Sequence, residues 1–161
     1  MRILGIDPGT RIVGYGIIED NQGTLTAIHY GAIRTKAKEH ISLRLRTIYE
    51  YLVKVIEQYT PEVAAIEKVF YGKNIQSSIR IGEGRGVALL AVAKANLDIH
   101  EYDATKIKKA VCSVGSARKH QVQSMVQTIL QLPELPTPSD AADALAIAIC
   151  HHNNFRFSQW K

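Results

Sequence analysis

The ten residues Met1-Arg2-Ile3-Leu4-Gly5-Ile6-Asp7-Pro8-Gly9-Thr10 set the pattern for the rest of the chain. Residues 3–6 are apolar apart from a glycine and predict a buried strand, which Asp7-Pro8-Gly9 ends with residues that favour a turn. A carboxylate at the end of a core strand is held more rigidly than one on a loop, which suits a functional site. On these residues alone, a simple turn explains Asp7 equally well, because Asp, Pro and Gly all favour turns.

The composition is typical of a single globular domain spanning residues 1–161, with 46% hydrophobic and 22% charged residues. Twenty Lys and Arg against 15 Asp and Glu give a net charge of +5, which favours an acidic partner such as nucleic acid. Cys112 and Cys150 match no metal-ligand spacing and are expected to be reduced thiols. No apolar run is long enough for a membrane span, and Asp7-Pro8-Gly9 interrupts any signal peptide, so we expect a cytoplasmic protein without a membrane partner.

Hydrophobic periodicity predicts an α/β fold with a mixed five-stranded sheet and helices on both faces. Short turns join the first three strands, which predicts antiparallel hairpins, and helices alternate with strands afterwards. The predicted strands are 3–6, 12–18, 24–33, 63–66 and 97–102. The predicted helices are 41–59, the part of 71–95 that follows Gly86, 104–111, 119–130 and 138–152.

Four carboxylates stand where such a sheet could bring them together. Asp7 and Glu67 each end an apolar strand, while Asp140 and Asp143 lie one turn apart on a late helix. Four clustered carboxylates repel one another unless cations lie between them, and oxygen ligands suit Mg²⁺ or Mn²⁺. Two such ions about 3.5–4 Å apart can activate water and stabilise the leaving oxygen of a phosphodiester. Each acid also has a simpler interpretation: Glu67 and Asp143 as solvated charges, and Asp140 as part of a helix cap after Thr137-Pro138.

The chain resembles the RuvC family of bacterial Holliday junction resolvases over nearly its full length. The resemblance rests on residues 5–10 (GIDPGT), 66–70 (IEKVF), 84–86 (GRG), 115–119 (GSARK) and 140–146 (DAADALA). It implies a ribonuclease-H-like fold and a homodimer that cuts two opposed strands of a four-way DNA junction, with two Mg²⁺ ions per subunit and Mn²⁺ as a possible substitute. It implies that Asp7, Glu67, Asp140 and Asp143 are catalytic metal ligands, and that the branch-migration complex RuvA–RuvB is a partner.

The segment from Ala104 to Leu130 contains no acidic residue but several Lys and Arg residues, which indicates a phosphate-binding face rather than a neutralised structural helix. By resemblance, Lys108 and Lys119 approach the scissile phosphate, and Lys119 stabilises its charge during cleavage. The aromatic pair Phe70-Tyr71 could stack on unpaired bases. The predicted DNA-binding residues are Phe70, Tyr71, Lys73, Arg80, Arg85, Lys108, Arg118 and Lys119.

Two further motifs have less functional weight. Gly82-Glu83-Gly84-Arg85-Gly86 lacks the spacing and the preceding strand of a dinucleotide-binding loop, so its glycines are expected to let two helices or two subunits approach closely. The apolar helix after Gly86 is the candidate dimer interface, with intrachain packing as the alternative. His151 and His152 are adjacent on a helix and therefore point apart, which makes them poor joint metal ligands.

The predicted reaction is metal-dependent hydrolysis of a DNA phosphodiester that leaves 3′-hydroxyl and 5′-phosphate ends. Two alternatives stay open: a ribonuclease acting on structured RNA or an RNA–DNA hybrid, and a non-catalytic module that binds junctions. Sugar kinases and actin-like ATPases share an early Asp-x-Gly-x-Thr turn, but they enclose a nucleotide between two large lobes, for which this chain is short.

Overall fold

The computed structural model describes residues 1–68 and 74–159. The strands are β1 (Arg2–Asp7), β2 (Ile12–Asn21), β3 (Thr24–Arg34), β4 (Val63–Glu67) and β5 (Asp98–Tyr102). The helices are α1 (Ile41–Tyr59), α2 (Ile75–Lys94), α3 (Ala104–Cys112), α4 (Lys119–Ile129) and α5 (Ser139–Gln159). The sheet has the order β3-β2-β1-β4-β5; β1, β2 and β3 pair antiparallel, and β4 runs parallel to both β1 and β5. The predicted mixed five-stranded sheet is confirmed.

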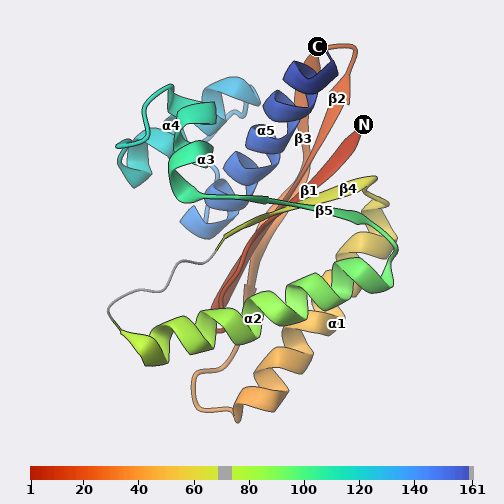
Figure 1. Ribbon diagram of the computed structural model, residues 1–161, viewed down its shortest axis with the longest axis vertical. Helices are drawn as coiled ribbons and strands as arrows, with labels where there is room; N and C mark the ends of the chain where they lie inside the picture. The colour runs from red at the N-terminus through yellow and green to blue at the C-terminus, as the bar shows by residue number, and fades with distance from the viewer. Residues whose placement is uncertain (69–73, 160–161) are drawn as a thin grey trace.

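Helices cover both faces of the sheet, as predicted (Figure 1). One hydrophobic core lies between the sheet and α1 and α2, and the other lies between the sheet and α3, α4 and α5. Alternate residues of β1 enter different cores: Leu4 and Ile6 face α1 and α2, whereas Ile3 faces α5. The polar residue that ends β1, Asp7, therefore belongs to the α5 side, because it has the same parity as Ile3.

Helix α5 lies unusually close to the sheet because glycines line its path. A Cβ added at Gly5 would overlap the carbonyl oxygen of Ala144 and stand 2.9 Å from the nitrogen of Ala148. A Cβ added at Gly14 would overlap the carbonyl oxygen of Asp140. Small residues on the helix complete this contact: Ala141, Ala142, Ala144, Ala146 and Ala148 are all buried. Between residues 141 and 152 the one position that is not buried is Asp143.

Helix α2 begins earlier than the sequence indicates. We expected a helix only after Gly86, but α2 starts at Ile75, where the Asn74 side chain accepts a hydrogen bond from the Ser77 backbone N–H at 3.1 Å. Interior glycines cost a helix stability, so their presence argued against this start. Gly84 has a packing reason, since an added Cβ would overlap the carbonyl oxygen of Gly9 in the turn after β1. The close approach that we predicted for these glycines is thus made at Gly84, but to a turn of the same chain.

Helix α5 also continues past the predicted end at His152. Asn153 donates a hydrogen bond from its side chain to the carbonyl oxygen of Ala110 in α3 at 3.1 Å, so tertiary contact extends a stretch that is polar in sequence. The two preceding histidines point apart, as predicted: His151 pairs with the Tyr102 hydroxyl and His152 with Asp20, each at 2.8 Å. Among the helices of the described residues, none combines the length and apolarity needed to cross a membrane.

The glycine path makes a graded prediction for stability. Gly5→Ala should lower the free energy of unfolding by about 3 kcal/mol, because the added methyl group meets backbone that cannot turn aside. Gly16→Ala should cost less, about 2 kcal/mol, since its nearest neighbours are the Leu145 side-chain atoms Cδ2 and Cγ, at 2.7 and 2.8 Å, which can shift more readily than backbone, and the Leu145 backbone nitrogen is further away at 3.1 Å. Urea unfolding followed by circular dichroism measures both, and equal losses would contradict the backbone contact at Gly5.

Candidate active site

The ends of the two central strands bring Asp7 and Glu67 side by side. Strands β1 and β4 are parallel, and their last registered pair is Ile6 with Ile66. The next residues along each strand are the two acids, which lie on the α5 side of the sheet because β-strand side chains alternate. Neighbouring parallel strands therefore present both carboxylates at one edge.

The first turn of α5 adds the other two acids. Asp140 lies over Gly14, and Gly14 is the β2 partner of Asp7 in the antiparallel β1–β2 ladder. Asp143 follows one turn later and is the partly exposed position in an otherwise buried stretch. Because α5 crosses the sheet at backbone contact distance, its N-terminal acids are carried to the strand ends. The structure thus brings together the four carboxylates predicted from the sequence.

The pKa values of the acids show that their charges interact. The pKa of Asp7 is raised to about 8 by burial first, then by the negative charges of Asp143, Glu67 and Asp140, while Lys119 opposes the shift. The pKa of Glu67 is raised by burial and by Asp143, and the positive charge of Lys108 acts in the opposite direction. Near neutral pH Asp7 consequently holds a proton until a cation replaces it.

Two lysines face this acidic edge. Lys119 forms an ion pair with Asp143, with Nζ 2.8 Å from Oδ2, and this hydrogen bond raises the pKa of Lys119. A cavity of about 260 Å³ lies between α3, α4 and α5, and its lining includes Glu67, Lys108, Lys119 and Asp143. Carboxylates and ammonium groups at one cavity can bind a metal ion and a phosphate next to each other.

The donor set fits a hard divalent cation. All four groups are carboxylates, and their mutual repulsion is relieved when a cation binds between them. In the described residues, no three His, Cys, Asp or Glu side chains are already arranged around a single metal position. One carboxylate is turned instead to a lysine, because Asp143 and Lys119 neutralise each other. A metal ion would take over that neutralisation, so Lys119 would have to release Asp143.

The predicted DNA-binding residues divide into three groups. Lys108 on α3 and Lys119 at the start of α4 line the same cavity as Glu67 and Asp143, and Arg118 is the exposed residue that precedes Lys119 at the N-cap of α4. Arg80 and Arg85 lie on α2, which packs on the face of the sheet opposite α5, so they are not gathered with the acids. They form ion pairs with Glu83 at 2.9 Å and with Glu101 at 2.6 Å. Phe70, Tyr71 and Lys73 lie outside the described residues.

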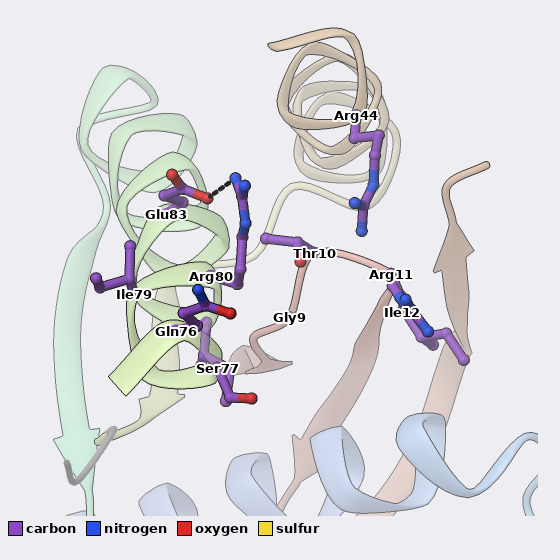
Figure 2. A pocket seen from close by; sticks show the side chains of 11 residues that line it. Gly9, Thr10, Arg11, Ile12, Arg44, Gln76, Ser77, Ile79, Arg80 and Glu83 are labelled. Atoms are coloured by element: carbon purple, nitrogen blue, oxygen red, sulfur yellow. Dashed lines mark hydrogen bonds and ion pairs between the residues drawn. The ribbon is translucent and has the colours of Figure 1, made fainter. Parts of the chain in front are cut away.

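Two features near the site were missed in the sequence. Asp103 caps α3 by accepting a hydrogen bond from the Lys106 backbone N–H, and its charge contributes to the raised pKa of Glu67. Arg44 is buried on the inner face of α1 and, with Thr10 and Arg11, lines a second cavity on the opposite side of the sheet (Figure 2). In the sequence, the available signal for the burial of Arg44 was its place in the apolar stripe of α1, one position before Leu45.

A mixed sheet with carboxylates at the ends of its central strands and on the helix that crosses it defines a nuclease of the ribonuclease-H-like class. The family model described as "Crossover junction endodeoxyribonuclease RuvC" matches residues 3–151. The chain therefore belongs to the RuvC family, and the resemblance noted in the sequence is confirmed.

Individual relatives agree with this assignment. The crossover junction endodeoxyribonuclease RuvC of Geobacter sulfurreducens is 49% identical over 154 residues, which cover 96% of this chain and 93% of the relative. RuvC of Dehalococcoides mccartyi is 49% identical over 158 residues, which cover 98% of this chain and 96% of the relative. The structure of T. thermophilus RuvC in complex with a Holliday junction substrate superposes with a TM-score of 0.92 at 31% identity, covering 98% of this chain and 96% of that one. The yeast mitochondrial Holliday junction resolvase Ydc2 shares the fold alone, with a TM-score of 0.66 and 16% identity.

Because the acids are crowded, we expect that replacing one of them lowers the activity but raises the stability of the metal-free protein. Asp7→Asn should abolish cleavage, by about 10²–10³-fold or more, while leaving junction binding measurable. The same change should raise the melting temperature of the metal-free protein. The pKa of Asp7 is 3.8 in the unfolded chain and about 8 in the folded protein, so between these values the folded state keeps a proton that the unfolded state has released. The free energy of unfolding of the wild type therefore falls as pH rises from about 4 to about 8.

Differential scanning fluorimetry in EDTA between pH 5 and 9 tests this, and the gap between the melting temperatures of variant and wild type should widen up to about pH 8 and then stay constant. Added Mg²⁺ should stabilise the wild type, more strongly at pH 8 than at pH 6, because binding must displace the Asp7 proton. A less stable variant with full cleavage activity would overturn both parts of the prediction.

Proposed function

We propose that this chain is a homodimeric endonuclease that resolves four-way DNA junctions by paired nicks, with two Mg²⁺ ions per subunit and Mn²⁺ as a substitute. The observation that carries the proposal is the geometry that brings four carboxylates together: the parallel ends of β1 and β4 place Asp7 beside Glu67, and the close contact of α5 with the sheet places Asp140 and Asp143 next to them. The raised pKa of Asp7 supports this grouping. The substrate follows from family membership and from the similarity to T. thermophilus RuvC, whose structure holds a Holliday junction.

The four acids have distinct positions for holding the ions. Asp7 has all three other acids as neighbours, and it would hold the ions together with Glu67 from β4 and Asp140 and Asp143 from α5. When bound, the divalent ions supply Lewis acidity that activates water and neutralises charge on the departing 3′ oxygen. The strand ends and the sheet-bound start of α5 keep the carboxylates fixed, so little reorganisation is needed during reaction.

The lysines are expected to receive the scissile phosphate. Lys119 neutralises Asp143 in the absence of other cations, and its half-exposed ammonium group can turn to a phosphate oxygen once Asp143 has a metal partner. Lys108 stands by Glu67 at the other side of the same cavity. Both would stabilise the negative charge that develops on the phosphorus oxygens, and hydrolysis would leave 5′-phosphate and 3′-hydroxyl ends.

The outer face of α2 supports a dimer. An apolar stripe with helical spacing runs along it, through Ile75, Ile79 and Leu90, which are 74%, 56% and 53% exposed. Gly82 and Gly86 continue the same stripe, and a Cβ added at either would meet nothing within 4 Å. A stripe of large apolar residues interrupted by open glycines is suited to close packing against a second helix. Two-fold symmetry would then present one active site to each of two equivalent strands.

Two further expectations remain proposals. A cytoplasmic location accords with two cysteines that are both free thiols. The branch-migration complex RuvA–RuvB is the expected partner on the basis of family resemblance.

Incubation with a synthetic four-way junction tests the proposed function directly. With Mg²⁺ or Mn²⁺ we expect symmetric nicks in two opposed strands, resealed by DNA ligase, and no cleavage in EDTA. An RNA–DNA hybrid of the same sequence should be cut far more slowly. A junction that is bound but never cut would indicate a non-catalytic module, and faster cleavage of the hybrid would indicate a ribonuclease.

The dimer makes a separate prediction. Leu90→Glu should place a charge in the α2 interface and shift the protein to a monomer, which sedimentation equilibrium detects. Cleavage should then lose its pairing, so that single nicks accumulate. Leu135→Glu is the matched control, because this leucine is 47% exposed in the loop before α5 and outside the stripe. If Leu90→Glu remains as dimeric as Leu135→Glu, another surface forms the dimer.

A further inference from the structure

The second cavity lies on the opposite side of the sheet from the acids. It has a volume of about 920 Å³ and is bounded by the turn after β1, the start of α1 and the first half of α2 (Figure 2). Three arginines from three separate parts of the chain line it: Arg11, Arg44 and Arg80. The one acid in its lining is Glu83, which is already paired with Arg80 at 2.9 Å. The cavity is therefore positively charged.

Arg44 is the unusual member of this set. It is only 9% exposed, yet it has no carboxylate partner among the described residues, and its Nη2 atom is buried without a hydrogen-bond partner. Figure 2 shows its guanidinium group extending from α1 into the cavity above Thr10 and Arg11. A buried charge without a counter-charge is strongly unfavourable, and an anion bound in the cavity would relieve that cost.

The buried arginine is also connected to the turn that follows Asp7. Arg44 donates from Nε to the Thr35 hydroxyl oxygen at 3.0 Å, and that hydroxyl donates to the carbonyl oxygen of Thr10 at 2.6 Å. These bonds hold the guanidinium in place at the wall of the cavity, while the Nη2 atom keeps donors that no group of the described residues uses. A fixed guanidinium with free donors is the group best suited to phosphate oxygens.

The geometry points to a phosphate-binding site in this cavity, formed by Arg44, Arg11 and Arg80, that takes a backbone phosphodiester of the bound DNA. This inference rests on the proposed function and adds a contact on the face of the sheet opposite the acids. Two observations favour DNA over a small ligand. The cavity is wide, and its arginines come from separate elements, which suits an extended DNA strand. Its wall begins at Gly9, in the turn that directly follows the catalytic strand end.

Salt-dependent junction binding tests the site. In EDTA, fluorescence anisotropy with a labelled four-way junction should show Arg44→Gln and Arg11→Gln binding about 3–10-fold more weakly than wild type at fixed salt. Each lost phosphate contact should also reduce the slope of log K against log salt by about 0.9. Arg46→Gln is the matched control and should change neither quantity. It lies on the same helix two residues further on, is 67% exposed, pairs with Glu50 and does not line the cavity.

Three outcomes would be decisive beyond the expected one. Unchanged affinity and slope in both Arg11→Gln and Arg44→Gln would overturn the inference. If Arg44→Gln does not fold, the exposed Arg11 decides alone, because its side chain holds no part of the core. Titration with inorganic phosphate, followed by thermal melting, separates the ligand sources. Arg44-dependent stabilisation by phosphate with unaltered junction binding would assign the cavity to a small phosphate compound and overturn the DNA contact. Absence of junction binding in the wild type itself would instead refute the proposed function.

Discussion

The close approach of α5 to the sheet is the constraint on which the active site depends. Glycines at positions 5 and 14 remove the side chains that would hold the helix away, and the alanines of α5 do the same from the other side. The helix is consequently fixed by backbone contact, which leaves little freedom to slide or tilt. Asp140 and Asp143 are therefore placed by packing that lies well inside the core, and the parallel register of β1 and β4 places Asp7 and Glu67 in the same way.

This rigidity allows a charge arrangement that would otherwise disperse. Four carboxylates at one edge repel one another, and the protein answers in two ways when no metal is bound: Asp7 keeps a proton near neutral pH, and Lys119 neutralises Asp143. Both the proton on Asp7 and the ion pair of Asp143 with Lys119 form reversibly, and a bound cation can replace both. The electrostatic strain is thus a property of the site that divalent ions relieve, which is a common relation between function and stability in enzymes.

The sequence was sufficient to predict the sheet, its strand directions and the identity of the clustered acids. The apolar patterns of the strands are strong, and Asp7 and Glu67 each follow directly at the end of such a strand. It was insufficient where tertiary contact overrides local preference. The glycines of α2 argued against a helix before Gly86, yet the contact between Gly84 and the Gly9 carbonyl gives one of them a structural reason. Arg44 was missed because a charged residue on a helix is ordinarily solvated, and only the fold reveals that this one is buried.

The turn after β1 connects the acidic edge of the sheet with the arginine cavity. Asp7 faces α5 at its start, whereas Thr10 and Arg11 line the arginine cavity on the other side of the sheet. Arg44 reaches this turn through Thr35, so an anion held by Arg44 would bear on backbone only three residues from Asp7. Gly84 presses on the same turn from α2. Contacts with α1, α2 and the sheet all hold this segment, so it cannot move unless several of them change together. Phosphate bound on one face would therefore help to hold the strand end that carries the acid on the other.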